Sequence, residues 1–350
     1  MSIDKAKKLV EHSIKARKAK MGWSWGQGLL GSAMSELDDY LGSETSVEFL
    51  KGFCDHYVAN SPTVASSDTS APGMITYAMQ KKTGRADYKK LTDTVLDYIK
   101  NEPRLIEDAV NHLGSSVIGK FYPKSIWVDS LMMFSVFPAR YAMENNDAKL
   151  LDIAAKQVNI FAKYLMDKQD NLWYHSYWTK MATHYPISKI YWARGNAWVI
   201  SALPKIIDCI GEHPDKKEII MILNKTSEAL LQYQRADGAF DTVLNRGKTY
   251  RELSATALIA DGWLHGVRMG YLPEKFLQPA LNAYKAVDDA IIINNKGAYM
   301  PEISGPTSPL PICPYLVYKF TPRGKNLAYG LAAYIWASIE FDMYQRGGKK

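Results

Sequence analysis

The sequence has few cysteines, no long apolar run and no apolar segment at its start, and each absence excludes a class of protein. Its three cysteines are far apart and odd in number, which favours buried thiols in a reducing compartment over a disulfide framework. No stretch approaches about 18 consecutive apolar residues, so we expect no membrane-spanning helix. The charged first eight residues do not resemble a secretory signal, and the sequence therefore predicts a cytoplasmic protein. The cysteines are Cys54, Cys209 and Cys313.

Short motifs of several common chemistries are also missing. The sequence contains no H-E-x-x-H, paired C-x-x-C, G-x-S-x-G or Walker string, so it predicts no metal site, no cofactor and no nucleophilic serine. Residues 26–31 fit the G-x-G-x-x-G string of dinucleotide-binding folds, but the apolar strand that this motif needs in front of it is absent. Close packing of helices is the better interpretation of these glycines.

Positive charge is spread along the chain. The formal net charge is +7 at pH 7, yet the lysines and arginines form no stripe on any expected element. A nucleic-acid-binding protein would concentrate them on one face, so we expect no nucleic-acid partner. A diffuse positive field instead raises the rate at which an acidic small-molecule substrate is encountered.

Helical periodicity dominates the sequence and predicts about twelve amphipathic helices. Alternation of period two is scarce, so strands are expected only as short hairpins near residues 171–187 and 239–250. Residues 291–324 contain six prolines and are expected to be irregular; a loop of this length is more often functional than idle. The helices are expected near residues 3–19, 25–41, 45–59, 70–83, 87–100, 129–144, 147–167, 194–211, 216–233, 251–269, 274–290 and 325–345.

The arrangement of these helices predicts a closed fold. They follow one another in pairs, without a linker rich in proline, glycine or serine, which favours a single domain over residues 1–350. No fixed repeat length is visible, which counts against an open solenoid. Twelve paired helices would close as six inner and six outer ones, so the predicted fold is all-α, an (α/α)6 barrel. The irregular segment 291–324 could then cover the barrel mouth.

The most informative motif is at residues 192–198, which read W-A-R-G-N-A-W. Arg194 and Trp198 are four residues apart and would share one face of a helix, where a guanidinium fork can hold a carboxylate while an indole covers a sugar ring. This combination favours an acidic sugar as ligand. The alternative is a cation–π pair that only locks the start of the helix.

Two aspartates at expected helix starts are candidates for acid–base chemistry. Asp129 follows Trp127 and precedes an apolar helix, so a capping role is the simpler interpretation. A carboxyl beside a large apolar ring is desolvated, however, which would raise its pKa and keep some acid form near neutral pH. Asp68 lies in S-S-D-T-S-A-P-G, just ahead of another helix, where a cap is again the simpler interpretation.

Aromatic residues surround the remaining candidates. His175 lies among tryptophan and tyrosine residues in the hairpin expected near 171–187, where a hydrogen-bonded structural histidine is the simpler interpretation. Trp23 and Trp25 open the second helix. They either fill the core or form a flat platform for sugar rings.

Three motifs, in order, resemble the unsaturated rhamnogalacturonyl hydrolases of glycoside hydrolase family 105, close relatives of the unsaturated glucuronyl hydrolases. They are W-V-D-S-L-M-M at 127–133, the motif at 192–198 and S-A-T-A at 254–257, and the likeness extends over roughly residues 20–340. Ala197 stands where the family usually has glycine, a difference of one methyl group. The resemblance implies the same (α/α)6 barrel, Asp129 as general acid and Asp68 as a second active-site carboxylate. It also implies a substrate site formed by Arg194, Trp198, Trp127, His175, Trp25 and Trp192.

The resemblance further implies an unusual hydrolysis. The substrate would be an oligosaccharide cut by a lyase, whose terminal uronic acid carries a C4=C5 double bond. Protonation of C4 by Asp129 would create an oxocarbenium-like centre at C5, and water would add there with help from the resulting carboxylate. The hemiketal would then open and release the next sugar, from rhamnogalacturonan in the expected case. Ordinary glycosidases instead place two carboxyls around the anomeric carbon.

Other functions fit parts of the same pattern. Another (α/α)6 sugar enzyme, such as an inverting glycosidase or an epimerase, would use an acid and base at the anomeric centre or paired histidines, and none of the seven histidines is paired in a motif. A catalytically inactive sugar-binding homologue would keep the groove, but the retained Asp129 and Asp68 count against it. A helical scaffold for protein partners would need a long exposed apolar groove instead of clustered tryptophan, arginine and aspartate.

Overall fold

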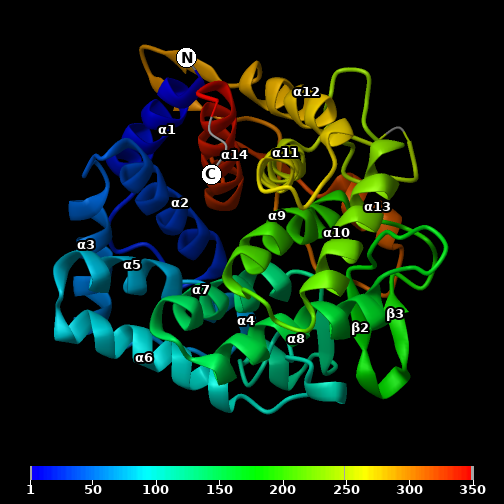
Figure 1. Cartoon of the computed structure of the whole chain (residues 1–350), viewed down its shortest axis with the longest axis horizontal. Coiled ribbons are helices and arrows are strands. Elements are labelled where there is room, and N and C mark those ends of the chain that lie inside the picture. Colours follow the sequence, from blue (N-terminus) through cyan, green and yellow to red (C-terminus); the bar gives the residue numbers. More distant parts are fainter. Residues whose placement is uncertain (1, 248, 348–350) are drawn as a thin grey trace.

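Two concentric rings of helices make up most of the computed structural model, which describes residues 2–247 and 249–347 (Figure 1). Within these residues the chain alternates six times between an outer and an inner helix, and the last inner helix packs against the first. This closure confirms the predicted (α/α)6 barrel. The inner helices are α2 (Trp25–Leu41), α5 (Gly73–Thr83), α7 (Val136–Asn145), α9 (Ala193–Cys209), α11 (Leu253–Arg268) and α14 (Ala328–Gln345). The outer helices are α1 (Ser2–Ala16), α3 (Val47–Ala59), α6 (Ala86–Asn101), α8 (Ala148–Leu165), α10 (Lys216–Leu231) and α12 (Leu277–Asp288).

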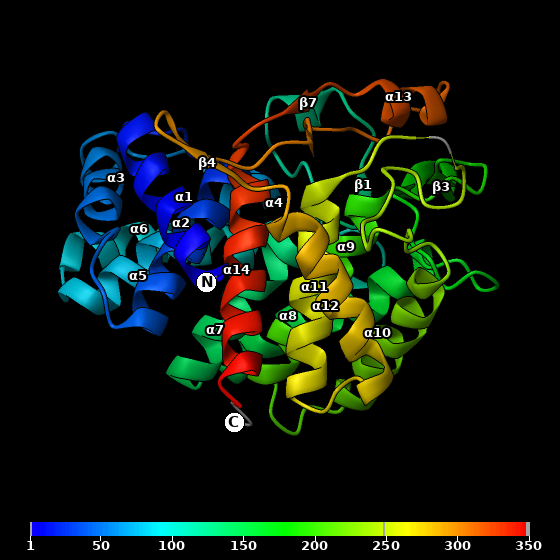
Figure 2. The same ribbon diagram turned by 90° about the horizontal axis from the view of Figure 1, so that it is seen from above.

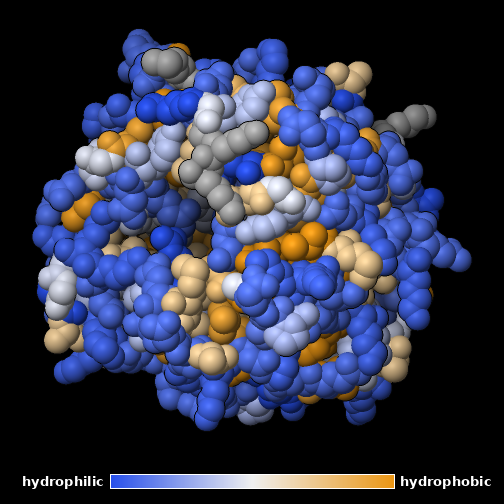
Figure 3. Space-filling view, in the orientation of Figure 1, coloured by the Kyte–Doolittle hydropathy of each residue, from blue (hydrophilic) through white to orange (hydrophobic). Residues whose placement is uncertain are grey.

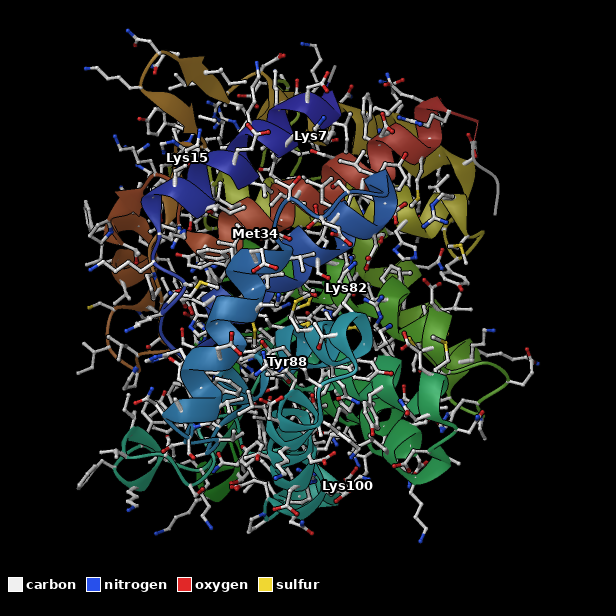
Figure 4. All side chains as sticks on the ribbon, turned by 90° about the vertical axis from the view of Figure 1, so that its left-hand side faces the viewer. Lys7, Lys15, Met34, Lys82, Tyr88 and Lys100 are labelled. Atoms are coloured by element: carbon white, nitrogen blue, oxygen red, sulfur yellow. The ribbon has the colours of Figure 1, made fainter. Side chains whose placement is uncertain are left out.

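The two rings differ in how much of each helix is buried. Outer helices bury one face only, as their amphipathic sequences require: Lys7 on α1 and Lys100 on α6 are exposed at the outside (Figure 4). Met34 on α2 and Tyr88 on α6, labelled in the same view, are fully buried. The inner helices are enclosed by neighbours, and α11 is buried without a break from Leu253 to Gly266.

Helix α2 approaches the segment of α4 (Ser67–Ser70) and α5 closely, and two glycines permit this contact. A Cβ on Gly28 would lie 2.7 Å from the carbonyl carbon of Ala71, and a Cβ on Gly31 would overlap Ile75. The G-x-G-x-x-G string therefore lies inside a helix and serves close packing, as the sequence predicts.

Two of the predicted helices are interrupted near the carboxylates that the sequence singles out. One breaks at Pro72 into α4 and α5, because proline has no N–H to continue the helical ladder. The other begins with a π-helical turn over Leu131–Ser135 and continues as α7. Such turns are rare and often mark functional sites. The interruptions lie next to Asp68 and Asp129, respectively.

Short strands gather at one end of the barrel. Three of them form an antiparallel sheet in the order β1-β2-β3, which confirms the hairpin predicted near 171–187. The hairpin predicted near 239–250 is wrong, because the residues described there take part only in isolated bridges. The strands are β1 (Ser125–Trp127), β2 (Ser176–Trp178) and β3 (Thr183–Tyr185).

The proline-rich segment lies over the same end. Strands β4 and β5 form a hairpin, and β6 pairs with β7 on either side of the short helix α13. Figure 2 shows β7 and α13 at the end of the barrel opposite the C-terminus. We call residues 305–322, between β6 and β7, the cap segment. The elements are β4 (Ile292–Asn294), β5 (Gly297–Tyr299), β6 (Ile303–Ser304), α13 (Pro314–Phe320) and β7 (Arg323–Gly324).

The opposite end of the barrel faces the viewer in Figure 3, and its surface is hollowed there. A cavity of about 240 Å³ opens among the C-terminal ends of inner helices. Its charged groups are paired; for example, Lys205 Nζ lies 2.6 Å from Asp261 Oδ2. None of the residues predicted for the substrate site lines this cavity.

Two expectations from composition can be compared with the structure. No helix in the part of the chain that the structure describes is long and apolar enough to cross a bilayer. Cys54 and Cys209 are buried free thiols, as predicted. Cys313 is exposed, so the prediction of three buried thiols is wrong at this position. It directly precedes α13 in the cap segment, which runs along the surface.

Candidate active site

The two predicted carboxylates lie at the end of the barrel where the cap segment packs, and neither of them is the N-cap residue of a helix. Asp68 lies in α4, whose capping residue is Ser66: its Oγ accepts a hydrogen bond from the backbone N–H of Thr69. Asp129 precedes the π turn, at whose start no side chain makes a capping bond. The capping interpretation is therefore wrong for both aspartates, and both side chains are left for other chemistry.

Asp129 is surrounded by groups that favour its ionised form. Its Oδ2 lies 3.3 Å from His175 Nε2, a close polar contact that lacks the geometry of a hydrogen bond. Burial by itself would raise the pKa of Asp129, but His175, His112 and Arg194 together lower it below its ordinary value. The predicted increase of this pKa by Trp127 is therefore wrong, because the polar and cationic neighbours outweigh the desolvation.

Asp68 shows the opposite shift. Its side chain is 32% exposed, yet desolvation by the surrounding protein and then the negative charge of Asp129 raise its pKa to about 7. Two carboxyls with pKa values pushed apart in this way titrate as a pair. Below about pH 7 the pair therefore holds one proton, which lies mainly on Asp68, and above that pH the pair loses it.

His112 is a site residue that the sequence analysis missed. Its ring stacks on Trp127 with centroids 4.4 Å apart, and its Nε2 lies 3.5 Å from Asp68 Oδ1. Its Nδ1 lies 2.9 Å from the Oγ of Ser130. Burial lowers the pKa of His112 to about 4, so the ring is neutral at pH 7. No motif marks it, because it lies in an irregular segment that meets Asp68 only in the folded chain.

Arg194 is fully enclosed, and its fork already has partners. Its Nη1 donates to the carbonyl of Ser304 at 2.9 Å, and its Nη2 donates to the carbonyl of Gly305 at 2.8 Å and to Thr307 Oγ1 at 3.3 Å. The fork that was expected to hold a substrate carboxylate thus fastens the start of the cap segment. Glu252, which the sequence analysis also missed, lies 3.9 Å away and supplies the opposite charge.

The ring contacts of Arg194 also differ from those expected. Its guanidinium lies over Trp192, 4.7 Å from the ring centroid, and over Tyr329, at 4.8 Å. The predicted cation–π pair with Trp198 is therefore wrong. Trp198 is completely buried and meets Trp25 edge-on, at 6.2 Å between centroids.

The other predicted tryptophans are unequally accessible. Trp127 and Trp192 are buried, and Trp192 stacks on His175 at 4.3 Å. Trp25 is partly exposed, stacks on Tyr329 and lines a cavity of about 300 Å³ beside the cap segment. Trp23 donates through Nε1 to the carbonyl of Thr69 and packs in the core. Trp23 and Trp25 are both partly exposed, and Trp25 lines the cavity beside the cap segment.

The cap segment reaches into the site through one side chain. Tyr318 on α13 is 1% exposed, and its hydroxyl lies 2.9 Å from His175 Nδ1. Its ring lies parallel to that of Trp192, with centroids 5.9 Å apart. A second tether is the hydroxyl of Tyr122, which donates to the carbonyl of Pro309 at 2.7 Å. Through Tyr318 and His175 the cap segment therefore reaches the side of the site where Asp129 lies, whereas the Asp68 side chain stays 32% exposed.

The position of Arg194 predicts a stability effect. Arg194→Lys keeps the charge but cannot bond two carbonyls with one planar group, and hydrogen bonds to charged groups contribute about 1.5–3 kcal/mol. We expect the free energy of unfolding to fall by about this amount in a denaturant titration. Arg235→Lys, which changes an exposed arginine paired with aspartates, is the control and should change little. Equal stabilities of the two variants would contradict the anchoring role.

Comparisons with known proteins agree with this architecture. Residues 2–345 match the family described as Glycosyl Hydrolase Family 88. The unsaturated rhamnogalacturonyl hydrolase YesR of Bacillus subtilis (strain 168) is 26% identical over 263 residues, which cover 75% of this chain and 75% of YesR. The unsaturated 3S-rhamnoglycuronyl hydrolase of Alteromonas sp. (strain LOR) is 26% identical over 224 residues, which cover 63% of this chain and 52% of that protein.

A solved structure extends the likeness to the fold. The family 105 glycoside hydrolase of C. acetobutylicum ATCC 824 is similar with a TM-score of 0.86 and 26% identity, over 97% of this chain and 99% of that one. The inner and outer rings described above are thus shared over almost the whole length. Since the family match likewise extends over nearly all residues, the chain belongs to Glycosyl Hydrolase Family 88.

Proposed function

We propose that this protein hydrolyses the bond between an unsaturated uronic acid and the next sugar of an oligosaccharide produced by a lyase. Family membership and the names of the relatives support a glycosidase of this kind. The observation that carries the proposal is the pair of Asp68 and Asp129, whose pKa values are shifted in opposite directions at the capped end of the barrel. Such a pair supplies a carboxylic acid and a carboxylate at the same pH.

The chemistry of the substrate matches this pair. The C4=C5 double bond of the uronic acid is an enol ether, so protonation of C4 leaves an oxocarbenium-like centre at C5. Water adds to C5, and the hemiketal opens and releases the next sugar. We assign the donation of the proton to the pair Asp68 and Asp129 acting together, and the activation of water to the carboxylate that the donation leaves. Without substrate, the raised pKa of Asp68 and the lowered pKa of Asp129 place the shared proton on Asp68.

Several residues are proposed to bind this substrate. Trp25 is proposed as the platform for a sugar ring, since it is partly exposed and lines the cavity beside the cap segment. His175 and Trp127 are proposed to border the reacting ring, because both lie next to Asp129. Arg194 is proposed to act on the uronate through the cap segment, which it holds at Ser304 and Gly305. Trp192 and Trp198 support these groups from the buried side.

The leaving sugar and the compartment are part of the proposal. The names of both curated relatives contain rhamnose, in rhamnogalacturonyl and rhamnoglycuronyl, so we propose rhamnose as the leaving sugar. The net charge of +7 favours encounter with such acidic oligosaccharides. We also propose that the chain works as one catalytic domain in the cytoplasm, where its three free thiols would stay reduced.

The proposed reaction predicts a strict requirement for the double bond. An unsaturated uronyl–rhamnose disaccharide should be consumed, with loss of the ultraviolet absorbance of its double bond and release of rhamnose. The matching saturated disaccharide should release no rhamnose, because it has no C4 to protonate. Efficient cleavage of the saturated compound would instead identify a conventional inverting glycosidase, and turnover of neither compound would favour a sugar-binding homologue.

The carboxyl pair predicts the effect of an isosteric change. Asp129→Asn should lower kcat by about 10²–10⁴-fold, the usual contribution of general acid–base catalysis, because an amide cannot accept or deliver the proton. Asp93→Asn is the matched control, since Asp93 is an exposed residue of α6 that pairs only with Lys89 in the described structure. Rates are measured by loss of absorbance, and folding is checked by circular dichroism. A variant that kept more than about a tenth of the rate would exclude Asp129 from catalysis.

The shifted pKa values predict the pH dependence. The reactive form has one proton on the pair, and this proton is lost as the pH rises through the pKa of Asp68, about 7. We therefore expect kcat/KM to fall by about tenfold for each pH unit well above that value. The lowered pKa of Asp129 keeps it ionised on the acid side, so no matching loss is expected near pH 5. A rate that stayed constant to roughly pH 9 would contradict the assignment.

A further inference from the structure

Two histidines flank the carboxyl pair, one beside each aspartate. His112 Nε2 lies 3.5 Å from Asp68 Oδ1, and His175 Nε2 lies 3.3 Å from Asp129 Oδ2; both are polar contacts without the geometry of a hydrogen bond. A neutral imidazole carries its proton on one nitrogen only, and the partner of the other nitrogen decides which one. The groups bound to the two Nδ1 atoms therefore determine whether each histidine donates to its aspartate or accepts from it.

The surroundings of His112 make it an acceptor toward Asp68. Its Nδ1 lies 2.9 Å from Ser130 Oγ, and the Ser130 hydroxyl donates its proton to Ser67 Oγ at 3.0 Å. Since Ser130 has no second proton to give, it must accept from the Nδ1–H of His112. The Nε2 of this neutral ring is then a bare lone pair facing Asp68. An acceptor at that place favours the protonated carboxyl over the carboxylate.

The surroundings of His175 make it a donor toward Asp129. The only hydrogen-bond partner of the Tyr318 hydroxyl among the described residues is the Nδ1 of His175, at 2.9 Å. Burial and then the charge of Asp129 raise the pKa of Tyr318 well above its ordinary value, so the phenol keeps its proton. If it did not donate this proton to Nδ1, the O–H would be buried without a partner, which is costly. Donation places the proton of His175 on Nε2, facing the carboxylate.

We infer that Ser130 is a positioning residue that, with Ser67, keeps the proton of His112 on Nδ1, so that the unprotonated Nε2 faces Asp68 and favours the protonated form of that carboxyl. This inference rests on the proposed function, in which that proton is delivered to the substrate. Ser130 does not touch the reacting atoms. It acts through His112, and His175 completes the arrangement by presenting the opposite tautomer to Asp129.

The other groups near Asp68 do not oppose this arrangement. Asp129 faces it with a negative charge, which also favours the protonated form of Asp68. From α6, the phenol of Tyr98 lies within the field of Asp68; its pKa is raised, so it is uncharged at neutral pH. No lysine or arginine of the described chain pairs with Asp68. The tautomer of His112 is therefore the feature of this site that a serine substitution can reverse.

The test is a direct reading of the tautomers. The protein is labelled with ¹⁵N at histidine, and the ring nitrogens are observed by NMR without substrate; His112→Gln assigns the signal. The wild type should show His112 protonated on Nδ1. Ser130→Ala removes the acceptor of that proton, so His112 should change to protonation on Nε2 and donate to Asp68. The fall of kcat/KM at alkaline pH should then begin about one pH unit lower.

A second variant tests whether Ser67, through Ser130, also controls the tautomer of His112. Ser67→Ala removes the acceptor of the Ser130 proton, which frees Ser130 to donate to Nδ1 and should also shift the proton of His112 to Nε2. Ser130→Thr keeps the hydroxyl and should behave as wild type. Ser135→Ala is the matched control, because Ser135 is a buried serine of the same π turn whose hydroxyl has no hydrogen-bond partner in the described structure.

The outcomes separate the inference from the proposed function. A wild-type His112 already protonated on Nε2 would overturn the inference, as would Ser130→Ala and Ser67→Ala proteins that keep the wild-type tautomer. Loss of activity in Ser130→Ala without a change of tautomer or pH dependence would show a merely structural serine and would likewise overturn it. The tautomers are read without substrate, so failure to cleave unsaturated disaccharides counts against the proposed function alone.

Discussion

The repulsion between two carboxyl groups in a desolvated site is the interaction around which the rest of this structure is arranged. Desolvation and then the negative charge of Asp129 raise the pKa of Asp68 to about 7, so the protonated form of Asp68 prevails below that pH. The neighbours break the symmetry of the pair. Asp129 has His175 and the positive charge of Arg194, whereas Asp68 has the neutral ring of His112. Acid and base are thus separated by environment and not by residue type.

The barrel provides the position of this pair, and the cap segment packs against the side of the site that holds His175 and Asp129. Gly28 and Gly31 let α2 pack closely on the segment that follows α4 and on α5. The Ser70 hydroxyl donates to the carbonyl of Met133 and so joins α4 to the π turn. Above them, Arg194 and Tyr122 bind the first part of the cap segment at Gly305 and Pro309, and Tyr318 reaches His175. Exclusion of water strengthens each of these electrostatic contacts. Arg194 therefore both holds the cap segment and lowers the pKa of Asp129, and Tyr318 of the cap segment bonds His175, which lowers the same pKa.

The cap segment also explains why Arg194 was misinterpreted. From the sequence, its spacing from Trp198 suggested a fork open to a substrate carboxylate. In the folded chain the carbonyls of Ser304 and Gly305 occupy that fork, and Trp192 and Tyr329 cover its faces. Apart from Trp192, these partners come from segments more than a hundred residues away, and local spacing contains no information about them. A charged group enclosed by protein bonds to whatever acceptors the fold brings to it.

The amino-acid sequence by itself determined the helices and their pairing, because periodicity and glycine and proline stops are local properties. It indicated Asp68 and Asp129 only through the family resemblance of its short motifs. It also correctly placed Gly28 and Gly31 in a helix contact. Tertiary structure alone decided the protonation of those carboxylates. Desolvation raises the pKa of Asp68 and His175 helps to lower that of Asp129, and both effects depend on distances between elements that are far apart in the chain. For the same reason, His112, Tyr318 and Glu252 became visible as site residues only after folding.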